Sequence, residues 1–328
     1  MSQTAFVTGA TGFVGAHLVR QLLGRGWDVT VLVREQSSQR DIQDLDLRYR
    51  FGDVTDHDSV RAAMPAGVDA VFHVAASTNI WSRHNEAQTA VNVGGTDHVV
   101  RAAIERNARR FVHTSSFIVW GFQDGTIDED TPWTAGDEWI NYLRTKRLAE
   151  RRVRQAVEAG ELDAVICNPA HVLGPGDRHN WSRMIRLVDQ QKLPGVPPGG
   201  GAFADVREVA GAHIAAWERG ETGSNYLLGG PDIPFLELIR LAGELLGKPV
   251  PARASPAWQL GVMARLSTAL ARVTGKAPDI TPEGAAMICR HMHCDSSRAR
   301  ERLGYAFTPP RDLLQDTIDW MRSEGLVT

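Results

Sequence analysis

The chain has 328 residues, of which 43% are hydrophobic and 23% charged, and its 36 Lys and Arg residues nearly balance its 39 Asp and Glu residues. This length predicts one large domain or two ordinary ones, and the composition excludes a disordered or collagen-like chain. The charge balance predicts neither a nucleic-acid partner nor a membrane partner. Three cysteines are too few for a disulfide framework. We find no signal-peptide pattern and no membrane-spanning apolar run, so we expect a cytoplasmic protein.

Short apolar runs alternate with helical patterns through the first half of the chain. Strands are predicted over residues 5–8, 28–33, 70–75, 111–115 and 164–168, and helices over 13–25, 91–106 and 138–159. Strands that alternate with helices of this length are typical of βαβ crossovers. The runs VTVLV and AVFHVAA are apolar at consecutive positions, which indicates strands covered on both faces. The sequence therefore predicts an α/β fold with a doubly wound parallel sheet, the Rossmann arrangement.

The pattern changes after Asn168. Residues 169–203 are rich in Pro and Gly, which predicts loops around one short helix over 183–191. A helix is expected over 206–218, then a strand in the sequence YLLGG, and mostly helices from 234 onward. We therefore predict a core of residues 1–169 plus about 204–230. A smaller, mostly helical C-terminal substrate lid is predicted from about 170–203 and 231–328.

A glycine-rich turn joins the first predicted strand to the first helix. Gly9, Gly12 and Gly15 stand where a dinucleotide-binding loop needs a tight turn, a close approach of backbone to pyrophosphate, and close helix–strand packing. The amides at the helix N-terminus then face the phosphates. Because a strand precedes the motif and a helix follows it, the motif is specific. The predicted cofactor contacts here are Gly9, Thr11, Gly12, Phe13, Val14 and Gly15.

The second predicted strand indicates which dinucleotide binds. NAD sites usually place an acidic residue at the end of this strand to bind the ribose 2′-hydroxyl, but here Val33 stands there and Arg34 follows. A guanidinium suits a 2′-phosphate, so we predict NADP(H) as the cofactor. Glu35 leaves NAD(H) open as the alternative. Asp53, in the sequence GDV, is placed to accept a hydrogen bond from the adenine amine.

A serine, a tyrosine and a lysine form the candidate catalytic set. Tyr142 and Lys146 are four residues apart in a predicted helix, so they share one helical face. Ser116 follows the strand predicted over 111–115, at the carboxyl edge of the sheet, where open α/β sheets bind ligands. The pattern Tyr-x-x-x-Lys is frequent by chance, but together with the glycine loop and a serine at a strand end it indicates a functional site.

These motifs resemble those of the extended short-chain dehydrogenases/reductases, in the dihydroflavonol-reductase-like branch of the NAD-dependent epimerase/dehydratase family. The resembling segments are TGATGFVG (8–15), VLVRE (31–35), GDVTD (52–56), VFHVAA (71–76), NVGGT (92–96), VHTSS (112–116), YLRTK (142–146), NPAHVLGPGD (168–177) and FADVREVAGAH (203–213). Two positions depart from the pattern. Asn168 stands where many relatives have Arg before Pro, and Trp120 stands where epimerases commonly have Tyr.

The resemblance implies a role for each member of the catalytic set. Tyr142 would act as the general acid, with Lys146 as the nearby cation that helps the phenol to ionise and that bonds the nicotinamide ribose. Ser116 would hold the substrate carbonyl. Asn92 would be a fourth residue near the site, and it equally fits a helix residue that bonds neighbouring backbone. The further cofactor contacts are Val54, Ala75, Ala76, Thr114, Tyr142, Lys146, Asn168 and Pro169.

Tryptophans mark the expected substrate pocket. Five of them, Trp81, Trp120, Trp133, Trp139 and Trp181, fall in loops or helix starts that border the predicted site. Large aromatic side chains there indicate an apolar or aromatic substrate, although ordinary packing is the preferred interpretation for Trp139. The predicted substrate contacts are Ser77, Thr78, Trp81 and Trp181.

Two further segments are expected to be structural. The run from Cys289 to Cys294 resembles a metal cluster, but alternation along a strand would put His291 and His293 on one face and Cys294 on the other. Its spacing matches no zinc pattern, so no metal is predicted. Residues 257–270 are apolar enough to touch a membrane surface, but we expect a lid helix that packs on the core.

The sequence predicts an NADP-dependent oxidoreductase that reduces a ketone or aldehyde of an apolar or aromatic small molecule, reversibly with the alcohol. Two alternatives stay open: a nucleotide-sugar epimerase or dehydratase that keeps its NAD(P) bound, and a non-catalytic protein that senses NADP(H). A pure sensor has no need of the full set of Ser116, Tyr142 and Lys146. The expected partner is the small carbonyl or alcohol substrate, and a homodimer stays open.

Overall fold

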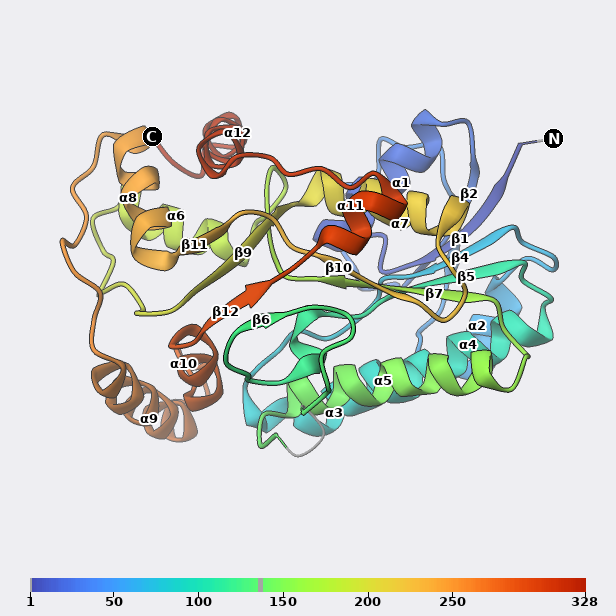
Figure 1. The fold of residues 1–328 in the computed structure, drawn as a ribbon, viewed down its shortest axis with the longest axis horizontal. Coiled ribbons are helices and arrows are strands. Elements are labelled where there is room, and N and C mark those ends of the chain that lie inside the picture. The colour runs from blue at the N-terminus through green and yellow to red at the C-terminus, as the bar shows by residue number, and fades with distance from the viewer. Residues whose placement is uncertain (1, 135–137) are drawn as a thin grey trace.

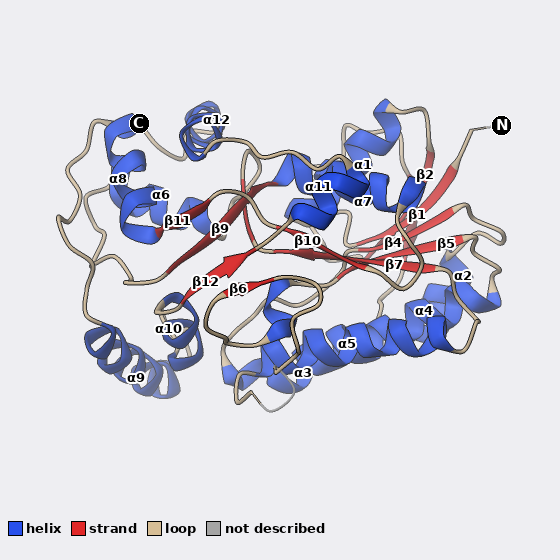
Figure 2. Cartoon of the chain, in the orientation of Figure 1, coloured by secondary structure: helices blue, strands red, loops and turns tan. Residues whose placement is uncertain are grey.

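The computed structural model describes residues 2–134 and 138–328 and centres on a seven-stranded parallel sheet (Figure 2). The sheet order is β10-β7-β5-β4-β1-β2-β3. The strands are β1 (Thr4–Thr8), β2 (Asp28–Val33), β3 (Arg48–Phe51), β4 (Ala70–His73), β5 (Arg110–Thr114), β7 (Ala164–Pro169) and β10 (Asn225–Leu228). The chain order reverses between β1 and β4, so a crevice opens at their carboxyl ends. This confirms the predicted doubly wound sheet.

Helices cover both faces of this sheet (Figure 1). One face packs against α1 (Phe13–Gly24) and α7 (Val206–Arg219), and the other against α2 (His57–Ala63), α4 (Gly95–Glu105) and α5 (Asn141–Glu158). Each layer buries its own apolar cluster, with Leu18 and Ile214 in one and Val99 and Val153 in the other. Because both faces are covered, strands such as DVTVLV are apolar at nearly every position.

The predicted helix over residues 91–106 differs from the structure. The short helix α3 (Asn85–Thr89) runs into a π-helical turn over Ala90–Gly94, and regular α-helix begins only with α4 at Gly95. A π-turn widens the backbone and is frequent at functional sites. Asn92 lies in this turn, so its side chain has a different direction from the one a continuous α-helix would give it.

The residues of the predicted lid, together with Thr126–Ile127 from the predicted core, form a second, smaller sheet that the sequence did not predict. Its strands are β6 (Thr126–Ile127), β8 (His171–Leu173), β9 (Gly200–Asp205), β11 (Asp232–Pro234) and β12 (His291–Cys294). Beside it lie α6 (Trp181–Asp189), α8 (Phe235–Leu246) and α12 (Pro310–Ser323), which share one apolar cluster with β9 and β11. These strands have two to six residues, too short for a clear periodicity.

The remaining C-terminal helices divide between core and periphery. The helix α11 (Ser297–Leu303) packs on the core, where Ala299 and Leu303 join the cluster beneath α7. The helices α9 (Ala257–Thr274) and α10 (Pro282–Ile288) instead form an arm at the edge of the lid (Figure 1). Among the described residues, no helix is both long and apolar enough to span a bilayer.

Candidate active site

The glycine loop between β1 and α1 is shaped by close backbone contacts. Gly9 has φ +77°, and a Cβ there would lie 2.6 Å from the Ala75 backbone nitrogen. A Cβ at Gly15 would overlap the Gly9 carbonyl oxygen. Gly12 caps α1 with an extended backbone and no side-chain hydrogen bond, and the first turn of α1 holds no acidic residue. The first amides of α1 are therefore left for an anion such as a pyrophosphate.

Arg34 and Glu35 follow β2 directly, and both side chains are exposed. The last residue of β2, Val33, is buried, so its side chain is turned into the protein rather than toward a ribose. Arg34 lies at the carboxyl edge of the sheet, next to the glycine loop, because β1 and β2 are neighbouring parallel strands. Its exposed guanidinium is therefore not held in a buried contact.

Asp53 begins the turn that follows β3. One oxygen of its carboxylate accepts hydrogen bonds from the Thr55 backbone N–H and hydroxyl, both at 2.9 Å. The next residue, Val54, is buried, and its carbonyl accepts a hydrogen bond from His98 at 2.9 Å. The turn is therefore rigid, and the second carboxylate oxygen of Asp53 is left for another donor.

Tyr142 lies in the first turn of α5 beside the end of β5. It belongs to an apolar cluster with Ile118, Trp120 and Met292, but part of its surface remains accessible. This burial raises the pKa of its phenol, and the neighbouring Ser116 hydroxyl acts in the opposite direction. Tyr142 and Ser116, which the sequence predicted to act together, thus lie close to each other.

The two neighbouring serines have different surroundings. The Ser115 side chain is buried and donates a hydrogen bond to Glu150 at 2.6 Å. Ser116 is half-buried, and its oxygen accepts a long hydrogen bond of 3.4 Å from the Ile118 backbone. Only Ser116 therefore has a hydroxyl that can meet both Tyr142 and a ligand.

Lys146 lies one helical turn after Tyr142, almost entirely buried. Its ammonium group donates a hydrogen bond to the Thr114 carbonyl oxygen at 2.8 Å. Desolvation by burial lowers the pKa of Lys146 to about 8, and the negative charge of Glu150 opposes this shift. The Thr114 hydroxyl is hydrogen-bonded to His213 at 2.8 Å, so this side chain points toward α7.

Glu150 is a residue of the site that the sequence reasoning missed. It is fully buried, one turn beyond Lys146 on α5, and its two oxygens accept hydrogen bonds from four side chains. These donors are Ser115 (2.6 Å), Asn168 (3.0 Å), Asn225 (2.8 Å) and Arg154 (3.3 Å). The signal in the sequence was its spacing, since residues 142, 146 and 150 form one stripe along a helix.

The sequence predicted Asn168 as a cofactor contact, but its side chain is used in hydrogen bonds within the protein. Its amide donates hydrogen bonds to Glu150 and to the Ser116 carbonyl oxygen, at 3.0 and 3.2 Å, and its carbonyl oxygen accepts one from Asn225 at 2.9 Å. The side chain is fully buried, so it braces the backbone of Ser116. Pro169 ends β7 beside it and pairs in register with Leu228.

Asn92 ties the loop after β4 to α5. Its side-chain oxygen accepts a hydrogen bond from the Ser77 N–H at 2.7 Å, and its amide donates to the Ser77 carbonyl and the Thr145 hydroxyl at 3.0 and 3.1 Å. Ala76 and Thr78 on either side of Ser77 are exposed. Asn92 is therefore a positioning residue in this geometry, and it holds the loop that faces the predicted cofactor and substrate.

The tryptophans do not all gather at one pocket. Trp120 is fully buried in the cluster that contains Tyr142, and its indole N–H donates to the Thr131 carbonyl at 3.0 Å. Trp133 lies under the Arg147 guanidinium, 3.2 Å from its ring centre. Trp81 is mostly buried in the loop after β4. Trp181 instead packs against lid aromatic side chains, with ring centres 4.8 Å from Phe203 and 4.9 Å from Phe235.

Trp181 was predicted as a substrate contact near Tyr142, but the two residues lie in different apolar clusters. Trp181 belongs to the apolar cluster of the lid, whereas Tyr142 belongs to a different cluster around Trp120. The structure therefore does not bring Trp181 together with the predicted catalytic set. Trp139 is 54% exposed, so it does not pack in the core as expected.

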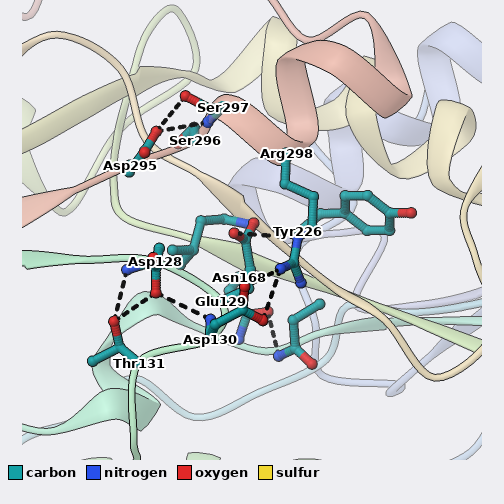
Figure 3. Close-up of polar contacts among 12 residues, drawn as sticks. Asp128, Glu129, Asp130, Thr131, Asn168, Tyr226, Asp295, Ser296, Ser297 and Arg298 are labelled. Atoms are coloured by element: carbon teal, nitrogen blue, oxygen red, sulfur yellow. Dashed lines mark hydrogen bonds and ion pairs between the residues drawn. The ribbon is translucent and has the colours of Figure 1, made fainter.

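The loop of residues 128–131 beside Trp120 is held by the C-terminal part of the chain (Figure 3). Arg298 of α11 pairs with Asp130 at 2.8 Å and lies 3.7 Å from the Glu129 carboxylate. Glu129 also accepts a hydrogen bond from the Leu227 N–H at 2.8 Å. Burial raises the pKa of Glu129. These contacts fasten the loop that carries the acceptor for Trp120.

The run Cys289–Cys294 forms the strand β12 together with the end of α10. The rings of His291 and His293 stack, with centres 4.5 Å apart, and both lie beside Asp232 of β11, at 2.8 and 3.0 Å. Met292 and Cys294 point to the opposite face, into the cluster of Tyr142. The expected alternation is confirmed, and Asp232 is a third member of the group that the sequence reasoning missed.

Comparison with known proteins agrees with this geometry. Residues 5–229 match the model of the NAD dependent epimerase/dehydratase family. The chain belongs to this family. It is therefore an NAD(P)-dependent enzyme of the extended short-chain dehydrogenase/reductase fold.

The proteins to which this chain is similar carry several different names. A Synechocystis protein named provisionally as a dihydroflavonol 4-reductase is 32% identical, over 100% of this chain and 97% of that protein. "Sterol demethylase protein B" of Methylococcus capsulatus is also 32% identical, over 99% and 100%. The crystal structure of gox2253 superposes with a TM-score of 0.87 at 33% identity, over the full length of both chains.

Proposed function

We propose that this family member is an NADP-dependent reductase that converts a ketone or aldehyde of an apolar or aromatic small molecule to the alcohol, reversibly. The observation that carries the proposal is the placement of Tyr142 beside Ser116, with Lys146 buried one turn away on the same helix. Relatives with reductase names support it, among them a 2-alkyl-3-oxoalkanoate reductase of Stenotrophomonas maltophilia, 29% identical over 91% of this chain.

The residues at the glycine loop fit a dinucleotide. The loop has no Cβ at its tightest points, and the N-terminal amides of α1 lack a side-chain cap. When bound, the dinucleotide supplies the hydride, and the protein supplies position and field. Gly9, Gly12 and Gly15 would hold the pyrophosphate, and Arg34 would hold the 2′-phosphate that distinguishes NADP from NAD.

The surroundings of Tyr142 support its role as the proton donor. Its raised pKa keeps the phenol protonated near neutral pH, the form that donates a proton to a carbonyl oxygen. The Ser116 hydroxyl would donate a hydrogen bond to the same oxygen and so hold the carbonyl in place. The phenolate left after transfer is stabilised by Ser116 and by the ammonium charge of Lys146. Because the pKa of Lys146 is about 8, this charge is present at neutral pH and is lost as the pH rises through about 8.

The substrate class follows from what surrounds Tyr142. Ile118, Trp120 and Met292 are apolar, and the polar side chains of Ser115 and Asn168 are already used in the Glu150 network. A carbonyl compound with an apolar or aromatic body suits such a wall. The exposed Thr78 lies on the adjoining loop and would contact the substrate together with Ser77 and Trp81.

A cofactor-consumption screen tests the proposal. Purified protein is mixed with NADPH and separately with aromatic aldehydes, ketones and nucleotide sugars, and absorbance of the reduced cofactor is followed. A reductase consumes NADPH in equal amount to the carbonyl. Interconversion of nucleotide sugars without net NADPH consumption would instead support the epimerase alternative. NADPH binding without turnover of any compound would support the sensor alternative.

A further inference from the structure

The helix α9 carries an unusual share of the exposed apolar surface. Of the ten large hydrophobic side chains that are exposed in the described residues, six lie on α9. They are Trp258, Val262, Met263, Leu266, Leu270 and Val273, with exposed fractions from 43% to 86%. Most of them recur every four residues and therefore form one outward stripe. Large apolar stripes of this kind mark interaction surfaces in soluble proteins.

The face of α9 that packs against the rest of the protein is opposite to the exposed apolar stripe. Leu260, Ala264 and Ala271 are buried, and Leu260 and Ala264 pack with Ala285 of α10. The sequence predicted that residues 257–270 pack on the core, and only this narrow face does so, through α10. The helix thus turns one leucine and two alanines inward and its other large apolar side chains outward.

The charged side chains of α9 and its C-terminal turn are all basic. Residues 245–278 contain no Asp or Glu, and α9 and its C-terminal turn carry Arg265, Arg272 and Lys276, all exposed. On a helical wheel the two arginines lie along one border of the apolar stripe. The next acidic side chain along the chain, Asp279, is already paired with Arg183 at 2.8 Å.

We propose that α9 docks flat onto an anionic lipid bilayer. Apolar side chains that include a Trp, bordered by Arg and Lys, are the features that hold a helix at the interface between headgroups and acyl chains. The anionic surface attracts the arginines and the lysine. A protein that bound this surface would need a matching apolar groove with acidic borders. An anionic bilayer offers an apolar interior and a negatively charged surface at every point.

The arm formed by α9 and α10 contacts the loop that precedes Trp81. Thr281, at the start of α10, donates a hydrogen bond to the Ile80 carbonyl at 3.4 Å, and Gly284 of α10 packs against the Ile80 side chain. Ile80 adjoins Trp81 in the loop that borders the candidate site. The α9 surface is therefore connected, through α10, to the expected substrate loop. The docking itself does not depend on the proposed reductase activity.

Vesicle co-sedimentation tests the proposal on the full-length protein. Wild-type protein is expected to pellet with phosphatidylglycerol–phosphatidylcholine vesicles, more weakly with pure phosphatidylcholine, and less as salt is raised. The double variant Leu266→Asp/Val273→Asp is expected to lose binding. The charge variant Arg265→Glu/Arg272→Glu is expected to bind at least ~tenfold more weakly. The control Phe51→Asp removes another exposed apolar side chain, 57% exposed on β3, and is expected to bind as wild type.

Three results would overturn the proposal. The first is wild-type protein that stays in the supernatant with anionic vesicles. The second is equal binding by the wild type and both α9 variants. The third is a wild-type dimer in light scattering that Leu266→Asp/Val273→Asp converts to monomer, which would make a second copy the occupant. If that variant fails to fold, the charge variant decides, because its substitutions lie on exposed side chains.

Discussion

Replacement of Glu150 by Gln is expected to move the pH dependence of the reaction. The Glu150 carboxylate lies one helical turn from Lys146, and its charge holds the pKa of Lys146 up against the desolvation that lowers it to about 8. Gln has nearly the same shape but no charge. The variant is therefore expected to lower the pKa of Lys146 further, so the ammonium form is lost at a lower pH.

The size of the shift follows from Coulomb's law. The Cβ atoms of residues i and i+4 of a helix are about 5–6 Å apart. If the two charges are separated by a similar distance, at an effective dielectric constant of ~20 two unit charges at 6 Å interact by about 2.8 kcal/mol. This energy corresponds to about 2 pK units, and relaxation of the network reduces it, so we expect ~1–2 units. The same substitution weakens hydrogen bonds from Ser115, Asn168, Asn225 and Arg154, which is expected to cost about 2–4 kcal/mol of unfolding free energy.

The assay is the rate of carbonyl reduction against pH at saturating NADPH. The wild type is expected to lose activity as pH rises through about 8, and Glu150→Gln is expected to lose it ~1–2 units lower. Glu158→Gln, at an exposed position of the same helix, is the control and is expected to keep the wild-type profile. An unchanged upper limb in a folded Glu150→Gln protein would refute the coupling between these two residues.

Four further outcomes are expected. Arg34→Ala should weaken NADPH binding ~10-fold or more and leave NADH binding nearly unchanged in fluorescence titrations, with a smaller difference at high salt; equal loss for both cofactors would contradict the assignment. Trp181→Ala should lower the unfolding free energy by about 3 kcal/mol with little change in KM, because the ring packs in the lid cluster; a raised KM with unchanged stability would return it to the pocket. The pKa values of the buried His73 and His213 are lowered to about 3 and about 4, below their unfolded value of about 6.5, so the unfolded chain binds more protons and stability falls as pH drops below 6.5. Urea unfolding at pH 5.5 should show a loss of ~1.4 kcal/mol per histidine relative to pH 7.5, and pH-independent stability would contradict this. Dialysis against EDTA should leave turnover unchanged, because strand alternation turns the histidines of β12 away from the face that Met292 shares with Tyr142; loss of activity restored by zinc would show a required metal.

The sheet and the glycine loop could be predicted because their physics is local. A buried parallel strand needs a continuous apolar run, as in DVTVLV, and its predicted bounds agree with β2. The turn after β1 needs glycine where the backbone meets Ala75, so Gly9 is readable from sequence alone. The spacing of Tyr142 and Lys146 likewise fixes their common face in any helix.

Other features depend on contacts between distant segments and left little local trace. The lid strands β9 and β12 are short and pair with each other only after the chain has folded back. The sequence predicted Trp181 as a substrate contact because it is a large aromatic residue near the expected site. In the structure it packs against Phe203 and Phe235, which come from other elements. Glu150 is a polar residue on a helix that looks solvated, and its burial becomes visible only when Asn168 and Asn225 of two strands are placed beside it.

Turnover of Tyr142→Phe tests the central claim most directly. The substitution removes one hydroxyl from a side chain that otherwise keeps its place among Ile118 and Trp120, so folding and cofactor binding should be retained. With the best carbonyl substrate of the NADPH screen, we expect turnover to fall by ~10²-fold or more and the Kd for NADPH to change by less than ~3-fold. Turnover equal to the wild type, in a variant that binds NADPH normally, would contradict the role of Tyr142 as the proton donor.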